Sequence, residues 1–144
     1  MFDNVLSKCS AIYRQDGNGA MLRQLYFKRG GTELTPGVIF YGADGPEFLA
    51  LADDAYLQEV AIPEKTQASG TVGWAYVRGP VDNVVTPSLS MAAGDVFSIV
   101  GGAIADTTNV YTTNIEGFAV SLETTTSATS HAMWLFGNIV TKTT

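Results

Sequence analysis

Few residues in this chain have the types and spacing that catalysis or metal binding requires. The sequence has one histidine, His131, and one cysteine, Cys9. A histidine can act as a general base or bind zinc, and a cysteine can act as a nucleophile, but each needs partner groups at fixed positions. No such motif surrounds either residue, so we expect His131 at the surface or edge of a strand and Cys9 as a free thiol. A single cysteine also excludes an intramolecular disulfide.

Three short motifs resemble ion-binding or phosphate-binding loops, and each lacks part of the required pattern. Asp16-Gly-Asn-Gly19 begins like a calcium loop, but no glutamate closes the loop twelve residues from its first ligand. Asp53-Asp54 stands where aspartate is favoured in a turn, and Gly101-Gly102 lacks the Lys-Ser/Thr of a phosphate loop. We therefore expect turns here, and a protein that is not an enzyme and holds no metal or cofactor.

Charge is distributed unevenly along the 144 residues, whose formal net charge is −6. Residues 1–30 carry five basic and two acidic side chains, whereas residues 31–144 carry three basic and twelve acidic ones. An acidic body argues against nucleic acid as a partner, because phosphate binding needs a basic surface. No run of about 18 apolar residues is present, so we expect no membrane span. Without an export signal, the chain is expected to mature in a cytoplasm or inside a particle.

The basic N-terminal segment interleaves cationic and aromatic side chains, which is the composition of an interface anchor. We expect residues 1–33 to form an extended arm that docks either on a partner or on the chain's own body. The candidate interface residues are Tyr13, Arg14, Arg23, Tyr26, Phe27, Lys28 and Arg29.

The rest of the chain has the pattern of an all-β protein. Short runs of β-branched and aromatic residues are separated by Gly, Pro, Asp and Asn, which predicts a small β-barrel or sandwich. A helix over 47–60 is the alternative for one segment, because its apolar residues show some helical spacing after Gly45-Pro46. We expect strand aromatics in the core, namely Trp74, Tyr76, Phe97, Phe118, Trp134 and Phe136. The expected strands are residues 38–41, 48–52, 56–62, 72–78, 95–100, 117–122, 132–136 and 138–142.

An internal repeat divides the body into two similar β-halves, 34–79 and 91–140, of one domain, 34–144. Residues 34–40 align with 91–97 at an offset of 57, which matches Gly37 with Gly94. Residues 60–62 align with 118–120 at an offset of 58. Residues 80–90, with Pro80 and Pro87, are expected to link the halves, because proline resists regular strand pairing. Chance similarity between Gly-rich and Thr-rich β segments is the alternative.

Three motifs in order resemble the capsid decoration (cement) proteins of tailed bacteriophages. They are Gly73-Trp-Ala-Tyr-Val-Arg-Gly-Pro80, then Ala92-Ala-Gly-Asp95-Val, then Gly117-Phe-Ala-Val-Ser-Leu-Glu123 before a last apolar strand. The resemblance covers about residues 70–140 and leaves out the N-terminal segment. The polar stretch 124–130 departs from the family pattern and is expected to be a variable outer loop.

The resemblance implies a structural protein that binds the outside of a phage head and stabilises the lattice of the major capsid protein. Such a protein is assembled in the host cytoplasm, is located on the exterior of the virion, and acts as a dimer or trimer. Two other functions remain open: a carbohydrate-binding or receptor-binding fibre module, or a tail or neck connector. The residues that would carry sugar binding are Asn109, Tyr111 and Asn114.

Overall fold

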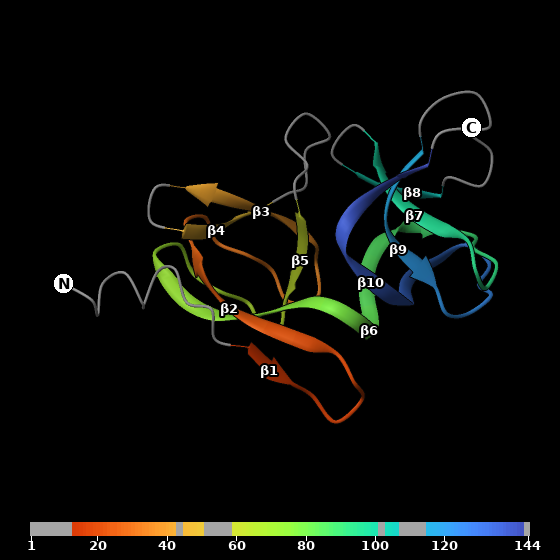
Figure 1. Ribbon diagram of the computed structural model, residues 1–144. Coiled ribbons are helices and arrows are strands. Elements are labelled where there is room, and N and C mark those ends of the chain that lie inside the picture. The colour runs from red at the N-terminus through yellow and green to blue at the C-terminus, as the bar shows by residue number, and fades with distance from the viewer. Residues whose placement is uncertain (1–12, 43–44, 51–58, 101–102, 107–114, 143–144) are drawn as a thin grey trace.

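All regular structure in the described part of the chain is β-strand (Figure 1). The computed structural model describes residues 13–42, 45–50, 59–100, 103–106 and 115–142. The all-β prediction is confirmed. None of these residues belongs to a helix long and apolar enough to cross a membrane. The strands are β1 (Tyr13–Gln15), β2 (Met21–Phe27), β3 (Gly37–Gly42), β4 (Gly45–Ala50), β5 (Glu59–Pro63), β6 (Thr71–Leu89), β7 (Val96–Val100), β8 (Ala103–Asp106), β9 (Ile115–Ser121) and β10 (Ala128–Lys142).

The ten strands make one sheet in the order β1-β2-β4-β3-β5-β6-β10-β9-β7-β8, with an additional pairing between β2 and β6. Neighbours are antiparallel except for the parallel pair β2–β4. The sheet is not closed as a whole, since β1 and β8 form its two ends, and the barrel or sandwich stays a prediction. Figure 1 shows β1–β5 on one side of the molecule, β7–β9 on the other, and β6 running between them.

Strand β6 changes partners along its length. Residues 71–78 pair with β2 on one edge, and Ala75 and Tyr76 pair with β5 on the other. From Gly79 onward β6 pairs with β10. Gly79 has a φ of 93°, and a Cβ atom there would lie 3.0 Å from both Cα of Ala20 and the carbonyl oxygen of Gly19. Glycine is therefore required where the strand passes from one set of partners to the other.

The predicted link over 80–90 is wrong, because β6 continues through both prolines. Pro80 lies directly opposite Trp134, and Pro87 lies in a stretch where three residues of β6 face one residue of β10 between the pairs Val85–Ser130 and Leu89–Ala128. Such an irregular position tolerates a residue without an N–H group. Asn83, with a φ of 60°, occupies a second bulge.

The two sets of strands repeat one pairing order, β4-β3-β5-β6 and β8-β7-β9-β10. The pair Gly37–Ala61 corresponds to Phe97–Ala119. The alignment of Ala61 with Ala119 therefore agrees with the register, whereas Gly37 corresponds to Phe97 and not to Gly94. Duplication of the halves stays a prediction, now with a corrected register for the β3 and β7 strands.

The same register assigns β2 to the first set of strands. Leu22 lies opposite Tyr76 in the first set, as Pro80 lies opposite Trp134 in the second. In this comparison, β2 takes the position in the first set of strands that β6 from Gly79 onward takes in the second set. The expected arm does not extend over residues 21–27, and residues 1–12 lie outside the described part.

Two hydrophobic clusters hold the sheet together. The first contains Phe27 and Phe48, whose ring centroids are 4.7 Å apart, with Leu25, Ile39, Ala61 and Ala75. The second lies among β6–β10, with Phe97 and Phe118 at 6.4 Å, and it also contains Val60 and Ile62 of β5. Because β5 contributes to both clusters, burial of apolar surface couples the two sets of strands.

Burial corrects several expectations about single residues. Phe97 and Phe118 lie in the core, but the core prediction is wrong for Trp134, which is 45% exposed. Trp74, Tyr76 and Phe136 are half-buried. The alternative of a helix over 47–60 is wrong where the chain is described, because residues 47–50 belong to β4 and residues 59–60 to β5. Residues 51–58 lie outside the described part.

Replacement of Gly79 tests the partner change in β6. We expect Gly79→Ala to lower the free energy of unfolding by about 2–3 kcal/mol. The alanine would have to adopt a positive φ, and its Cβ atom would lie only 3.0 Å from the backbone of Gly19 and Ala20. Gly17→Ala is the matched control, since no atom lies within 4 Å of a Cβ there, and we expect a change within about 0.5 kcal/mol. Urea unfolding measures both, and equal effects would contradict the assignment.

Candidate functional site

The seven residues predicted to form an interface fall into different environments. Phe27 is fully buried against Phe48, so its assignment to an interface is wrong. The spacing of aromatic and basic residues does not indicate that β2 has strand neighbours on both edges. Its apolar residues face the core. Tyr26 is half-buried, whereas Arg29 and Lys28 are exposed.

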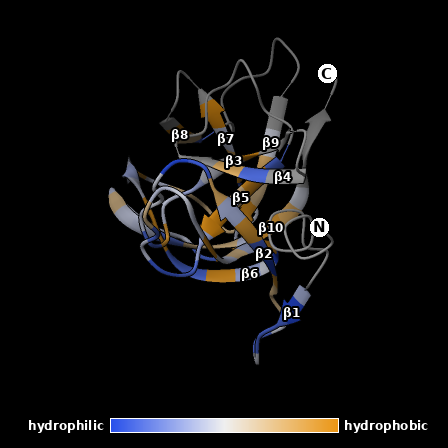
Figure 2. Ribbon diagram, turned by 90° about the vertical axis from the view of Figure 1, so that its left-hand side faces the viewer, coloured by the Kyte–Doolittle hydropathy of each residue, from blue (hydrophilic) through white to orange (hydrophobic). Residues whose placement is uncertain are grey.

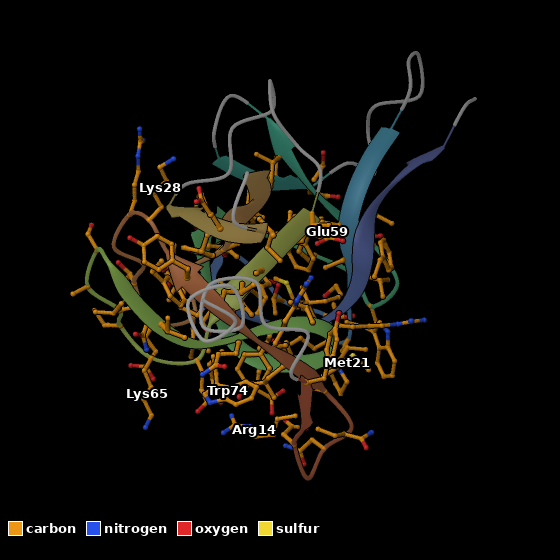
Figure 3. The ribbon with its side chains drawn as sticks, turned by 60° about the vertical axis from the view of Figure 1, so that its left-hand side comes forward. Arg14, Met21, Lys28, Glu59, Lys65 and Trp74 are labelled. Carbon is orange, nitrogen blue, oxygen red and sulfur yellow. The ribbon has the colours of Figure 1, made fainter. Side chains whose placement is uncertain are left out.

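Several of these cationic side chains contact the chain itself. Arg14 forms an ion pair with Glu64 and lies 4.9 Å from the centre of the Trp74 ring system. Figure 3 shows Arg14 beside Trp74, with Lys28 projecting outward elsewhere. Lys28 pairs with Glu47 at 3.3 Å. β1 is thus held against β6 and its preceding loop by charge and cation–π contacts, in addition to its pairing with β2.

A pocket of about 170 Å³ lies where the first set of strands meets β10. Its cationic groups are Arg23 on β2 and Arg78 on β6, and its acidic group is Glu59 on β5. Tyr13 and Phe136 supply aromatic walls, and Figure 3 shows two further lining residues, Met21 and Glu59, on the same side of the molecule. Of these residues, Tyr13 and Arg23 were predicted as interface residues and Phe136 as core.

Each arginine has a close neighbour among the other pocket residues. The Arg23 guanidinium lies over the Tyr13 ring at 5.5 Å from its centroid. The Arg78 side chain passes over Gly137, where a Cβ atom would lie 3.6 Å from Cδ and 3.7 Å from Cγ of Arg78. These distances are ordinary van der Waals contacts, and it is the φ of 87° at Gly137 that favours glycine at this position.

A second surface of interest is an apolar row across four strands. Pro80 of β6, Trp134 of β10, Val120 of β9 and Val96 of β7 lie directly opposite one another in turn. Directly opposite residues point to the same face of a sheet. Trp134 and nearby Leu122 are each 45% exposed. The sheet therefore presents an apolar face to solvent on this side.

The corresponding row in the first set of strands is covered. There Leu22, Tyr76 and Ile62 lie opposite one another, and Leu22 and Ile62 are fully buried. Ile62 belongs to the cluster that includes Met133 and Leu135, so the second set of strands supplies part of the cover. The row through Trp134 is less covered among the described residues, because Trp134 is 45% exposed and Pro80, Val120 and Val96 are half-buried. Figure 2 shows apolar residues on β6 and β7, whereas β1 is hydrophilic.

His131 is fully buried, which corrects the expectation of a surface or edge residue. Its Nε2 lies 3.3 Å from the Leu89 carbonyl oxygen and donates to it, and its Nδ1 lies 2.8 Å from Oγ1 of Thr86. The ring also meets the edge of Phe97 at 5.4 Å between centroids. These partners are about 35–45 residues away in sequence, so no local pattern around His131 indicates that it is buried. His131 therefore acts as a packed core residue.

The described residues contain no group of three or more His, Cys, Asp or Glu side chains that could hold a metal ion. Residues 16–19 form a turn, in which Oδ1 of Asp16 accepts hydrogen bonds from the backbone N–H groups of Asn18 and Ala20. The other motifs considered from the sequence lie outside the described part: Cys9, Asp53-Asp54, Gly101-Gly102, Asn109, Tyr111 and Asn114.

One titratable group is perturbed near the contact between the two sets of strands. Partial burial raises the pKa of the Tyr76 hydroxyl above its ordinary value, and the Asp16 carboxylate raises it further. The Arg14 guanidinium opposes this shift of the pKa, and Asp82 adds to it. The phenol therefore stays neutral at pH values where an exposed tyrosine ionises.

Comparison with protein-family models, curated proteins and solved structures finds no match to this chain.

The raised pKa of Tyr76 predicts how stability changes at alkaline pH. Above about pH 10 the unfolded state loses the tyrosine proton first, so the free energy of unfolding falls as pH rises toward the folded-state pKa. Tyr76→Phe removes this contribution to the fall in the free energy of unfolding, whereas the wild-type protein retains it. Urea unfolding of both proteins between pH 8 and 11 measures the difference, and parallel pH profiles would refute it.

Proposed function

We propose that this protein is a capsid decoration protein, which binds the outer surface of a phage head and stabilises the lattice of the major capsid protein. The observation that carries the proposal is the row of Pro80, Trp134, Val120 and Val96, in which Trp134 is 45% exposed and the other three residues are half-buried. In the corresponding row of the first set of strands, Leu22 and Ile62 are fully buried by protein, so the chemistry of this face suits contact with another protein. The order of the three sequence motifs supports the choice of that partner.

The row has the physical properties of a binding surface. An exposed tryptophan beside aliphatic side chains resembles the centre of a protein interface, where aromatic residues contribute most of the binding energy. Pairing among four strands holds these side chains in place before contact. Binding therefore loses less conformational entropy than it would on a mobile loop.

Stabilisation of a shell follows from linkage. A protein that binds the assembled lattice and not its separated subunits stabilises the lattice by about 2.7 kcal/mol per site at a free concentration of 100 Kd. Repetition over many equivalent sites opposes local opening under the pressure of packaged DNA. This role needs neither a catalytic group nor a cofactor.

The proposal includes the finer architecture and assembly. Strands β2, β4, β3, β5 and β6 pair in succession and β6 returns to β2, which supports a small barrel in the first half. We place the protein on the exterior of the virion after assembly in the host cytoplasm, as a dimer or trimer on the major capsid protein. Nucleic acid and membrane are not partners in this proposal.

Attachment to expanded heads that lack the protein is the direct assay of this function. We expect the wild-type protein to bind such heads and to raise their melting temperature. Trp134→Ser removes the centre of the row and should weaken binding at least tenfold, since a central aromatic contributes about 2 kcal/mol or more. Titration of heads followed by sedimentation measures the bound fraction.

Val72→Ser is the matched control, because Val72 is an exposed strand residue (39%) in the first set of strands. Its binding should equal that of wild type, with both variants folded by circular dichroism. Absence of wild-type binding, or equal losses in the two variants, would overturn the proposal. A copy number of tens or fewer per particle would indicate a fibre or connector instead.

A further inference from the structure

The pocket between β2, β5, β6 and β10 has a charge balance that differs from the rest of the molecule. Its two guanidinium groups, Arg23 and Arg78, outnumber its one carboxylate, Glu59, in a chain whose net charge is −6. The two guanidinium groups and one carboxylate give the described lining a net charge of +1, which complements a single negative charge. The charge balance therefore fits a monoanion.

Among the pocket residues, Arg78 is best placed to bind a monoanion. The Arg78 side chain is exposed, and it has no hydrogen bond or ion pair with another described residue. Arg78 lines the pocket, and its Cγ and Cδ atoms lie beside Gly137. The planar guanidinium donates two parallel hydrogen bonds, a geometry that matches a carboxylate.

Size and wall chemistry narrow the ligand further. A volume of about 170 Å³ holds five or six waters at about 30 Å³ each, and it is smaller than the 300–1,000 Å³ of typical small-molecule sites. It therefore suits one side chain rather than a nucleotide or a cofactor. The rings of Tyr13 and Phe136 and the Met21 side chain can cover the methylene groups of such a side chain.

We infer that this pocket binds the carboxylate of a glutamate or aspartate side chain that a partner protein inserts between Arg23 and Arg78. The inference deepens the proposed function, on which it rests for the identity of the partner as a shell subunit. The apolar row then supplies contact area, and the pocket supplies a charged contact that selects an acidic residue.

The test uses the free protein, so it does not depend on phage heads. The probe is N-acetylglutamate N-methylamide, a single carboxylate on a short side chain, and its glutamine analogue is the neutral control. We expect the glutamate compound to give saturable amide shifts at Arg78 and Gly137 in heteronuclear NMR spectra. The glutamine compound should give none at the same concentrations.

Two variants separate the pocket from nonspecific charge. Arg78→Gln should weaken binding of the glutamate compound at least tenfold, whereas Arg29→Gln, which removes an exposed arginine outside the pocket, should leave it unchanged. Equal losses in the two variants, no saturable shift in wild type, or tighter binding of inorganic phosphate would overturn the inference.

The same variants distinguish this inference from the proposed function. If heads bind wild type and Arg78→Gln equally while the glutamate compound does bind the pocket, attachment stands and the role of the pocket in it is refuted. If the pocket binds the compound but heads never bind the protein, the carboxylate site stands and the capsid partner is refuted.

Discussion

The structure depends on one strand that serves two sets of partners. β6 pairs with β2 and β5 over its first part and with β10 over its second, and Gly79 allows the backbone to pass between these partners. The clusters on either side are coupled through β5, because Val60 and Ile62 pack among residues of the second set. A substitution at this junction therefore affects the packing of both hydrophobic clusters, although each set of strands has its own hydrogen-bonded pairing.

The sequence was informative where local pattern decides structure and uninformative where distant partners decide it. Short runs of β-branched and aromatic residues between Gly, Pro, Asp and Asn located most strands, and the match of Ala61 with Ala119 agrees with the pairing. Local pattern does not reveal that β2 belongs to the sheet, because its partners in β6 begin more than forty residues later. Proline near Gly79 suggested a break, yet bulges and partner changes accommodate it within the strand.

The candidate site could be predicted only in part for the same reason. Aromatic and basic composition pointed to Tyr13 and Arg23, which do line the pocket, but Arg78 and Glu59 come from strands whose approach no local spacing encodes. Hydrophobicity placed Trp134 in the core, because residue type does not say which face of a strand is covered. Its exposure became informative only beside the corresponding row, in which Leu22 and Ile62 on either side of Tyr76 are fully buried.

The central claim is that the face carrying Trp134 attaches this protein to the outside of a phage shell. Electron cryomicroscopy of expanded heads, mixed with the purified protein and reconstructed, tests it most directly. The account predicts regular density outside the lattice, with strands β6, β10, β9 and β7 turned toward the capsid protein. Heads without added density, or density that meets the shell through the opposite face, would contradict it.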